Sequence, residues 1–94
     1  MAYKANLIVE VTTYTYNGTP VKAKGINGNV VCTTKEIMRI LFTGKNMNDT
    51  LDSIMDYRRG GYFKHDISVA LSEFGINSND TEYYNLRIWN ERAK

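Results

Sequence analysis

The sequence predicts a single α+β domain in which one antiparallel sheet carries helices on one of its two faces. Three observations lead to this prediction. Alternating apolar residues and an Asn-Gly pair indicate a hairpin in the first third, helical spacing dominates the middle, and a second alternating segment lies near the C-terminus. A length of 94 residues, with 43% hydrophobic and 23% charged residues, is typical of one globular domain. We therefore expect one domain over 1–94, with an N-terminal antiparallel β-meander, three short helices, and a C-terminal strand that returns to the sheet.

The first strand is predicted over 5–16, where apolar and polar side chains alternate and β-branched residues are dense. The pair Asn17-Gly18 predicts the turn, because both residue types tolerate positive φ. A return strand is expected over 21–26. A two-residue loop would place Val21 on the polar face of the first strand, whereas a three-residue loop ending in a bulge keeps it on the apolar face. We therefore favour the bulged loop.

A second Asn-Gly pair at 27–28 precedes a short third strand over 30–32. The first helix is predicted over 33–44, because Thr33 and Glu36 match a capping box and the apolar residues after them have helical spacing. A glycine stands where this helix would end.

The second helix is predicted from Asn48, as N-cap, to Arg59, and the third from about Asp66 until Gly75 ends it. The last strand is expected over 81–90, with alternate residues facing the helices. The core is predicted to contain Leu7, Val9, Val11, Val21, Val30, Ile37, Ile40, Leu41, Leu51, Ile54, Met55, Ile67, Leu71, Phe74, Leu86 and Ile88.

The composition argues against catalysis and against a metal or cofactor site. The single cysteine and single histidine exclude sites that need two thiols or two imidazoles. Cys32 follows two valines, which predicts a buried thiol, and His65 is expected at a helix start. Asp49, Asp52 and Asp56 recur at helical spacing and are interpreted as a solvated helix face. We expect no enzyme activity, no metal and no cofactor.

The chain shows no signal-peptide pattern and no long apolar span, so we expect a cytoplasmic protein without a membrane partner. One free thiol fits a reducing compartment.

Two groups of basic residues allow a nucleic-acid-binding function. Lys22 and Lys24 lie in the predicted N-terminal hairpin, within a half of the chain that is rich in basic residues. The segment 58–64 combines cations, two glycines and two aromatic residues in one predicted loop. Such cations can contact phosphates while aromatic rings stack on bases. The alternative is that these charges cap a helix and the aromatic residues pack.

The aromatic residues on the strands suggest a protein-binding surface instead. Tyr14 and Tyr16 share one face of the first strand, and Tyr83, Arg87 and Trp89 share one face of the last. Where these two faces coincide, the side of the sheet without helices carries an aromatic and arginine patch for a partner or a second copy of the chain. The alternative is cross-strand packing that only stabilises the sheet. The candidate partner-binding residues are Tyr14, Tyr16, Lys22, Lys24, Arg58, Arg59, Tyr62, Lys64, Tyr83, Arg87 and Trp89.

In its size, its AT-rich type of composition and its order of a hairpin followed by helices, the chain resembles small phage-encoded host-takeover proteins, including anti-CRISPR inhibitors. This resemblance implies that the protein binds a host protein or a nucleoprotein complex, for example a CRISPR effector. Inhibitors that mimic DNA are usually strongly acidic, whereas the net charge here is +2. The resemblance therefore implies steric blocking by direct contact.

Overall fold

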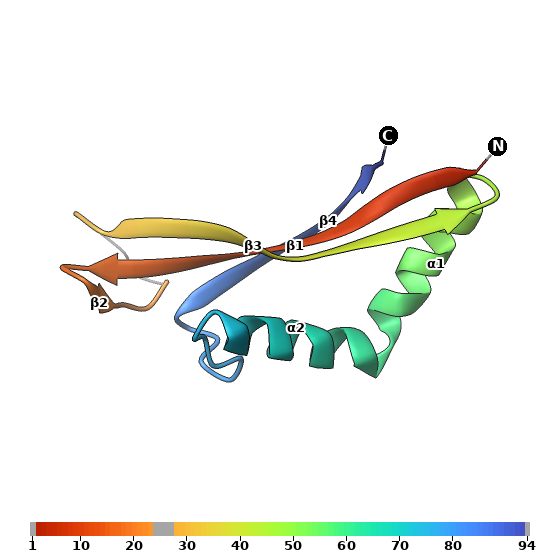
Figure 1. Cartoon of the computed structure of the whole chain (residues 1–94). Coiled ribbons are helices and arrows are strands. Elements are labelled where there is room, and N and C mark those ends of the chain that lie inside the picture. Colours follow the sequence, from red (N-terminus) through yellow and green to blue (C-terminus); the bar gives the residue numbers. More distant parts are fainter. Residues whose placement is uncertain (1, 24–27, 94) are drawn as a thin grey trace.

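A computed structural model describes residues 2–23 and 28–93 of the chain. The described elements are, in order, β1 (Tyr3–Tyr16), β2 (Thr19–Pro20), β3 (Val31–Gly44), α1 (Met47–Arg59), α2 (Gly61–Glu73) and β4 (Tyr84–Arg92). They form one antiparallel sheet with both helices on the same side of it (Figure 1). The expected α+β class fits this arrangement. The prediction of three helices is wrong, because the described residues contain two.

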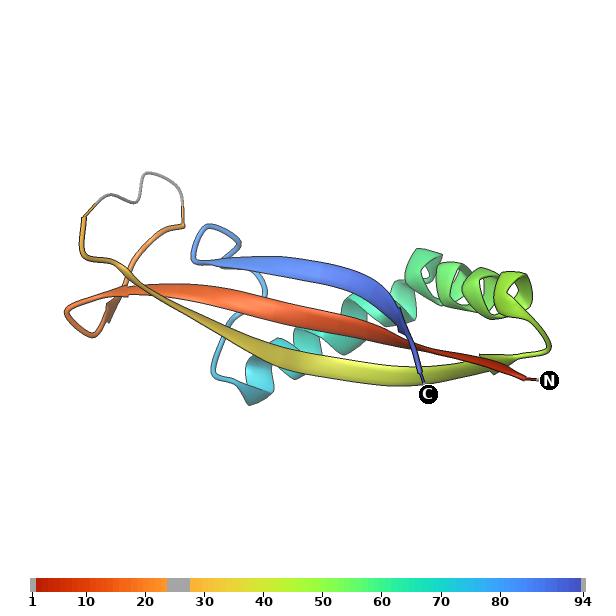
Figure 2. The same ribbon diagram turned by 90° about the horizontal axis from the view of Figure 1, so that it is seen from above.

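The central strand of the sheet is β1. Strand β3 pairs with it from Tyr3 to Thr15, while β4 and β2 occupy successive parts of its other edge (Figure 2). The long β1–β3 ribbon makes the molecule elongated, with extents of 51 × 25 × 21 Å. Its radius of gyration is 15.8 Å, whereas a compact chain of this length would have about 12 Å. Both termini lie at the end of the sheet opposite β2 (Figures 1 and 2).

The core lies between β1 and the helices. Leu7 and Val9, on alternate positions of β1, are fully buried against Ile54 of α1 and Phe63 of α2. A second cluster packs Leu71 of α2 against the same face of β1, nearer to β2. Burial of each large apolar side chain contributes about 1.5–3 kcal/mol. The predicted alternation of β1 is therefore what joins the two layers.

The segment predicted as the first helix is instead most of strand β3. A β-bulge at Ile37 causes the error, because Val9 pairs with Met38 while Glu10 pairs with Glu36. The extra residue shifts the alternation by one position, so that Ile37, Met38 and Phe42 all pack against the core. An apolar spacing of three therefore arises within a strand and imitates a helix.

Three residues predicted for the core are half-exposed instead. Leu41, at 54% exposure, lies on the face of β3 away from the helices. Met55 lies on the outer side of α1, and Phe74 is the C-cap of α2, where its ring faces the ammonium group of Lys35 at 5.8 Å. Leu41 was predicted in a helix that is a strand in the structure. Met55 and Phe74 were predicted on the buried face of a helix, and the structure does not bury these positions.

The turn after β1 has two residues, not three. Asn17 and Gly18 have φ values of 52° and 80°, and Tyr16 pairs directly with Thr19. The bulged loop was therefore the wrong choice. Strand β2 ends at Pro20, and Ala23 donates a hydrogen bond to the Glu82 carbonyl oxygen at 2.7 Å.

The chain leaves β1 at this point because β4 already pairs with the same edge of β1 over Ala5 to Thr13. The predicted strand over 21–26 is thus absent over 21–23, and its remainder, with Asn27 of the second Asn-Gly pair, lies outside the described residues. The expected third strand over 30–32 is the start of β3.

The boundaries of the remaining elements differ moderately from the predictions. Only Gly60, in an extended conformation, separates α1 from α2, so the last helix starts at Gly61 rather than near Asp66. Gly75 follows α2 with a φ of 75°, which confirms it as a stop. Strand β4 runs from Tyr84 to Arg92 rather than over 81–90, with Tyr84 facing the helices as expected. In the described part of the chain, no helix is long and apolar enough to cross a membrane.

The N-cap of α1 is Asn46 rather than the predicted Asn48. The Asn46 side-chain oxygen accepts a hydrogen bond from the Asp49 backbone N–H at 2.9 Å. We expect Asn46→Ala to lower the free energy of unfolding by about 1 kcal/mol, because this N–H loses its acceptor. Asn48→Ala, at an exposed position within the first turn, should change it by less than about 0.5 kcal/mol. Urea denaturation of both variants tests this, and equal losses would contradict the assignment.

Candidate functional site

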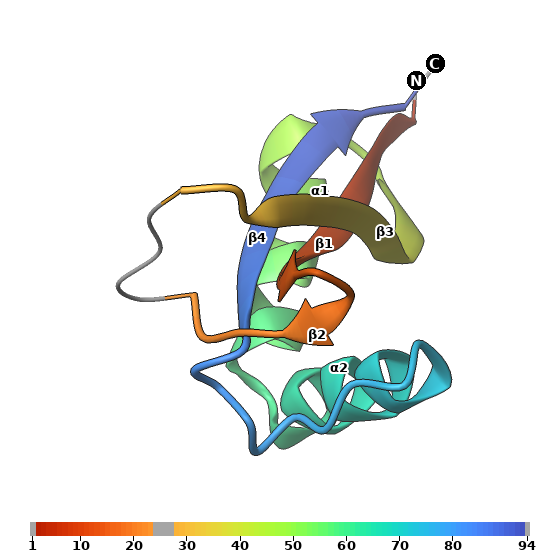
Figure 3. The ribbon, with the colours of Figure 1, turned by 90° about the vertical axis from the view of Figure 1, so that its left-hand side faces the viewer.

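Within residues 2–23 and 28–93, no helix covers one face of the sheet, because both helices pack on the other (Figures 1 and 3). We call this surface the open face and define it by register. It comprises Lys4, Asn6, Ile8, Glu10, Thr12 and Tyr14 of β1, Cys32, Thr34, Glu36, Arg39, Leu41 and Thr43 of β3, and Asn85, Arg87, Trp89 and Glu91 of β4. The expected coincidence of the two strand faces is confirmed, since β1 and β4 pair with Tyr14, Arg87 and Trp89 on the same side.

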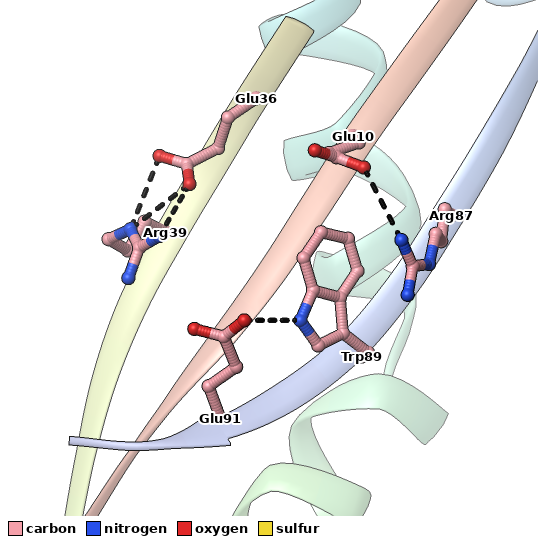
Figure 4. A network of polar contacts seen from close by, with 6 residues as sticks. All are labelled: Glu10, Glu36, Arg39, Arg87, Trp89 and Glu91. Carbon is pink, nitrogen blue, oxygen red and sulfur yellow. Dashed lines mark hydrogen bonds and ion pairs between the residues drawn. The ribbon is translucent and has the colours of Figure 1, made fainter. Parts of the chain in front are cut away.

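A polar network organises the middle of the open face (Figure 4). The Arg87 guanidinium lies 4.4 Å from the centroid of the Trp89 ring, a cation–π contact. The Trp89 indole N–H donates to a Glu91 carboxylate oxygen at 3.0 Å. Arg87 also approaches Glu10 on β1, with Nη1 4.0 Å from Oε1. These contacts hold an arginine and a tryptophan side by side at the surface.

A second ion pair lies across the β3 bulge. Arg39 donates hydrogen bonds from Nε and Nη2 to the Glu36 carboxylate, the shortest at 2.7 Å. This hydrogen bonding lowers the pKa of Glu36 and raises that of Arg39. Both side chains are well exposed, so the pair contributes little to stability. Its effect is to orient Arg39 beside the centre of the open face.

Trp89 also has a structural role. Ile8 points to the open face yet is fully buried, and its cross-strand neighbours are Trp89 and Arg39. Trp89 itself is half-buried. The cross-strand packing interpretation therefore fits Trp89, which pairs with Ile8 in the register of the sheet and leaves part of its ring exposed to solvent.

The charge of the open face does not favour a phosphate backbone. Two arginines, Arg39 and Arg87, stand among the carboxylates of Glu10, Glu36 and Glu91. Sequence reasoning missed Glu36, Arg39 and Glu91 as members of this surface. Glu36 and Arg39 were missed because the segment that contains them was predicted to be a helix, which gave no indication of a sheet face.

Toward β2, the open face becomes uncharged. The Thr12 and Thr34 hydroxyl groups are hydrogen-bonded at 2.8 Å, and the Asn85 amide donates to the Tyr14 hydroxyl at 2.6 Å. Tyr16 is exposed at the end of β1, and Tyr83 is exposed just before β4 begins. The strand aromatic residues thus extend the open face toward the β2 end.

The two predicted basic groups do not meet. Arg58 and Arg59 end α1, while Tyr62 and Lys64 are in the first turn of α2, so the predicted loop over 58–64 is a helix junction interrupted only by Gly60. Lys22 lies beyond β2 and pairs with Glu82 at 2.9 Å. Figures 1 and 2 show the β2 end and the helix junction well apart along the molecule. Lys24 lies outside the described residues.

The helix junction is held by Tyr57. Its hydroxyl donates to the Asp66 carboxylate, and its ring contacts Phe63 edge-on with centroids 5.2 Å apart. Burial and the hydrogen bond to Asp66 raise the pKa of Tyr57 to about 12. The contacts fix the angle at which α2 leaves α1, and with it the positions of Arg58 and Arg59.

The raised pKa of Tyr57 predicts a loss of stability at high pH. An unfolded tyrosine has a pKa of about 10, so the folded state binds this proton more tightly. Its contribution is complete below pH 10 and should disappear as the pH rises from about 10 to about 12. Tyr57→Phe should make the free energy of unfolding fall less steeply over this interval. Urea denaturation at pH 9 and pH 11 measures the difference, and parallel losses in both proteins would contradict the prediction.

The cysteine and the histidine lie in places other than predicted. Cys32 is exposed on β3 rather than buried, because its face of the strand is the open face. His65 lies within α2, beyond its first turn, and is also exposed. Among residues 2–23 and 28–93, no three potential ligands are grouped to hold a metal ion.

The fold and this surface define a class: a two-layer α+β protein whose sheet is helix-covered on one side and open on the other. No protein-family model matches the chain, and no curated protein or solved structure matches it.

Proposed function

We propose that the protein is a small, non-enzymatic binding protein whose open face contacts a larger protein partner. The observation that carries this proposal is the uncovered sheet face, where Arg87 and Trp89 are held in contact by Glu10 and Glu91. Tryptophan and arginine are the residues most enriched at the energetic centres of interfaces. A pre-ordered pair loses little conformational freedom on binding.

The charge pattern supports a protein partner rather than a nucleic acid. Nucleic-acid binding requires cations that neutralise phosphates along a continuous track. On the open face the cations Lys4, Arg39 and Arg87 are interspersed with three carboxylates, and the β2 end lies well apart from the helix junction (Figures 1 and 2). A mixed face of this kind matches protein surfaces, on which both signs of charge occur.

The mode of action we propose is steric blocking of a host protein or nucleoprotein complex, in the manner of phage-encoded inhibitors of CRISPR effectors. The elongated shape supports this, because a molecule with a longest extent of 51 Å can cover an extended groove on a larger particle. We place this activity in the cytoplasm, where an exposed free thiol such as Cys32 remains reduced.

The experiment compares two single-arginine variants. Thr34→Arg puts a bulky cation on the open face, next to its charged network, whereas Val69→Arg puts the same side chain on the exposed side of α2. The immobilised wild-type protein should capture a protein from bacterial lysate after nuclease treatment and in high salt. Thr34→Arg should lose that capture by about tenfold or more, while Val69→Arg should retain it.

A second arm tests the blocking itself. Purified CRISPR effector complexes cleaving target DNA should be inhibited by the wild-type protein and by Val69→Arg at near-stoichiometric concentration, but not by Thr34→Arg. If the protein that is captured dissociates when nucleic acid is removed, the open face is not a protein-binding surface. If Val69→Arg fails in the same way as Thr34→Arg, the binding surface lies elsewhere.

A further inference from the structure

Strand β4 forms an edge of the sheet that is unprotected. Among the described strands it pairs with β1 alone, continuously from Tyr84 to Arg92 and without a bulge or a proline (Figure 2). The opposite edge, β3, is interrupted by a bulge at Ile37. A bulge is one of the devices by which edge strands avoid pairing with other chains. Of the two long edges, β4 is the one open to another strand.

The backbone groups that β4 offers at this edge follow from its register with β1. Ala93 donates its N–H to the Lys4 carbonyl oxygen at 2.8 Å. Because successive residues of a strand direct these groups to opposite sides, the odd-numbered positions of β4 face β1. The even-numbered positions, including Leu86, Ile88 and Asn90, therefore point their N–H and C=O groups outward. A strand added at this edge would hydrogen-bond at the even positions.

The side chains of β4 are self-complementary about Trp89. When a second copy pairs antiparallel with Trp89 opposite its own counterpart, Arg87 lies opposite the partner's Glu91, and Glu91 opposite the partner's Arg87. These odd positions form the non-hydrogen-bonded pairs, whose Cα atoms are only about 4.5 Å apart. A shift of the axis to Ile88 or Asn90 removes both charge pairs. The Arg87 side chain is 74% exposed, so its guanidinium can turn outward from Glu10.

The same register also fills a cleft on the helix side. A cleft of about 420 Å³ lies between α1 and β4, lined by Leu51, Ile54, Met55, Arg58, Arg59 and Asn90. In this register Ile88 of the partner subunit lies opposite Asn90. An apolar side chain is thereby added beside Met55, which is 49% exposed in the single chain.

We propose that two copies of the chain associate through antiparallel pairing of their β4 strands, with the two-fold axis at Trp89. The sheet then continues across both copies, with the two open faces side by side. This proposal does not rest on the proposed function, since it concerns the edge of the sheet rather than its face.

A charge swap tests the register. Arg87→Glu places two pairs of like charges across the axis, as does Glu91→Arg, and each should weaken self-association by about tenfold or more. The double variant Arg87→Glu/Glu91→Arg restores opposite charges and should return the dissociation constant to within about threefold of wild type. The double variant, like the single variants, lacks the native contacts with Glu10 and Trp89. A recovery of its self-association would therefore report the charge pairs between the two chains. Arg39→Glu, on the far edge, is the matched control and should associate normally.

Sedimentation velocity over a range of protein concentrations measures these constants, with circular dichroism confirming that each variant is folded. A cysteine experiment adds an independent readout in a Cys32→Ser background. Chains carrying Arg87→Cys and Glu91→Cys, once mixed, should form the mixed disulfide faster than either forms a disulfide with itself. A wild-type protein that stays monomeric at several hundred micromolar overturns the proposal. So does a double variant as weak as the single ones, or an Arg39→Glu variant that is monomeric.

Discussion

Replacing Gly44 with alanine is expected to lower the free energy of unfolding by about 2–4 kcal/mol. A Cβ at this position would lie 2.5 Å from the Thr50 hydroxyl oxygen and 2.9 Å from the Thr50 backbone nitrogen. Thr50 cannot move aside easily, because it is fully buried at the start of α1. Its hydroxyl lies 3.2 Å from the Tyr3 carbonyl oxygen and 2.9 Å from that of Asn46, and donates to them. The substitution would therefore separate the end of β3 from α1.

The matched control for this variant is Gly61→Ala. No atom lies within 4 Å of a Cβ built at Gly61, which is the first residue of α2. Alanine there should leave stability unchanged or raise it by up to about 1 kcal/mol. Urea denaturation of the two variants measures the contrast. A Gly44→Ala protein as stable as the control would contradict the close packing of β3 on α1.

Ile54→Ala is expected to cost about 2–5 kcal/mol, because it removes a large side chain from the layer interface. Ile54 is 1% exposed and packs with Leu7, Val9 and Phe63, so the cavity left behind has walls from both the sheet and the helices. The total stability of a domain of this size is about 5–14 kcal/mol. The loss would therefore be a large part of it and would show as a much lower urea midpoint.

Met55→Ala provides the comparison at the next residue of the same helix. Met55 is 49% exposed, so its truncation should change stability by less than about 1 kcal/mol. The sequence pattern predicted both residues for the core, and only the structure separates them. Equal losses in the two variants would mean that Met55 is buried in solution, as the proposed dimer would make it, or that α1 is rotated. Repeating the measurement at low protein concentration distinguishes these cases.

Local patterns were sufficient where each residue interacts mainly with its chain neighbours. Asn17-Gly18 forms the predicted turn because two adjacent positive φ values are tolerated by few other pairs. The alternation in β1 and β4 correctly assigned Leu7 and Leu86 to the core side, since a strand buried on one face requires a period of two. The last turns of both helices end near glycines, as predicted.

Segment 33–44 shows where local patterns fail. Thr33 and Glu36 satisfy the capping-box pattern, yet the segment pairs with β1 over its whole length. The hydrogen bonds of that pairing come from a strand more than twenty residues earlier, so no local window contains them. The bulge at Ile37 then removes the period-two pattern that would have indicated a strand.

Only part of the candidate surface could likewise be predicted from local sequence patterns. The sequence placed Arg87 and Trp89 on one face of the last strand, and Tyr14 on one face of the first. It could not show that Glu36 and Arg39 join them, because this depends on the pairing of β3 with β1. Nor could it show that the segments of Lys22 and Arg58 are far apart. The sequence predicted the hairpin and the helix that contain them, but not how these two elements lie relative to each other.

By itself, the sequence determined the α+β class, which faces of β1 and β4 are apolar, and where the first turn lies. These properties follow from the periodicity of side chains and from the φ preferences of single residues. Only the tertiary structure decided that β3 is a strand, that β4 is an edge of the sheet, and that a network of arginines and carboxylates lies on the open face. Each of these depends on pairing between segments distant in the chain, where the energy of many long-range contacts outweighs local helix preference.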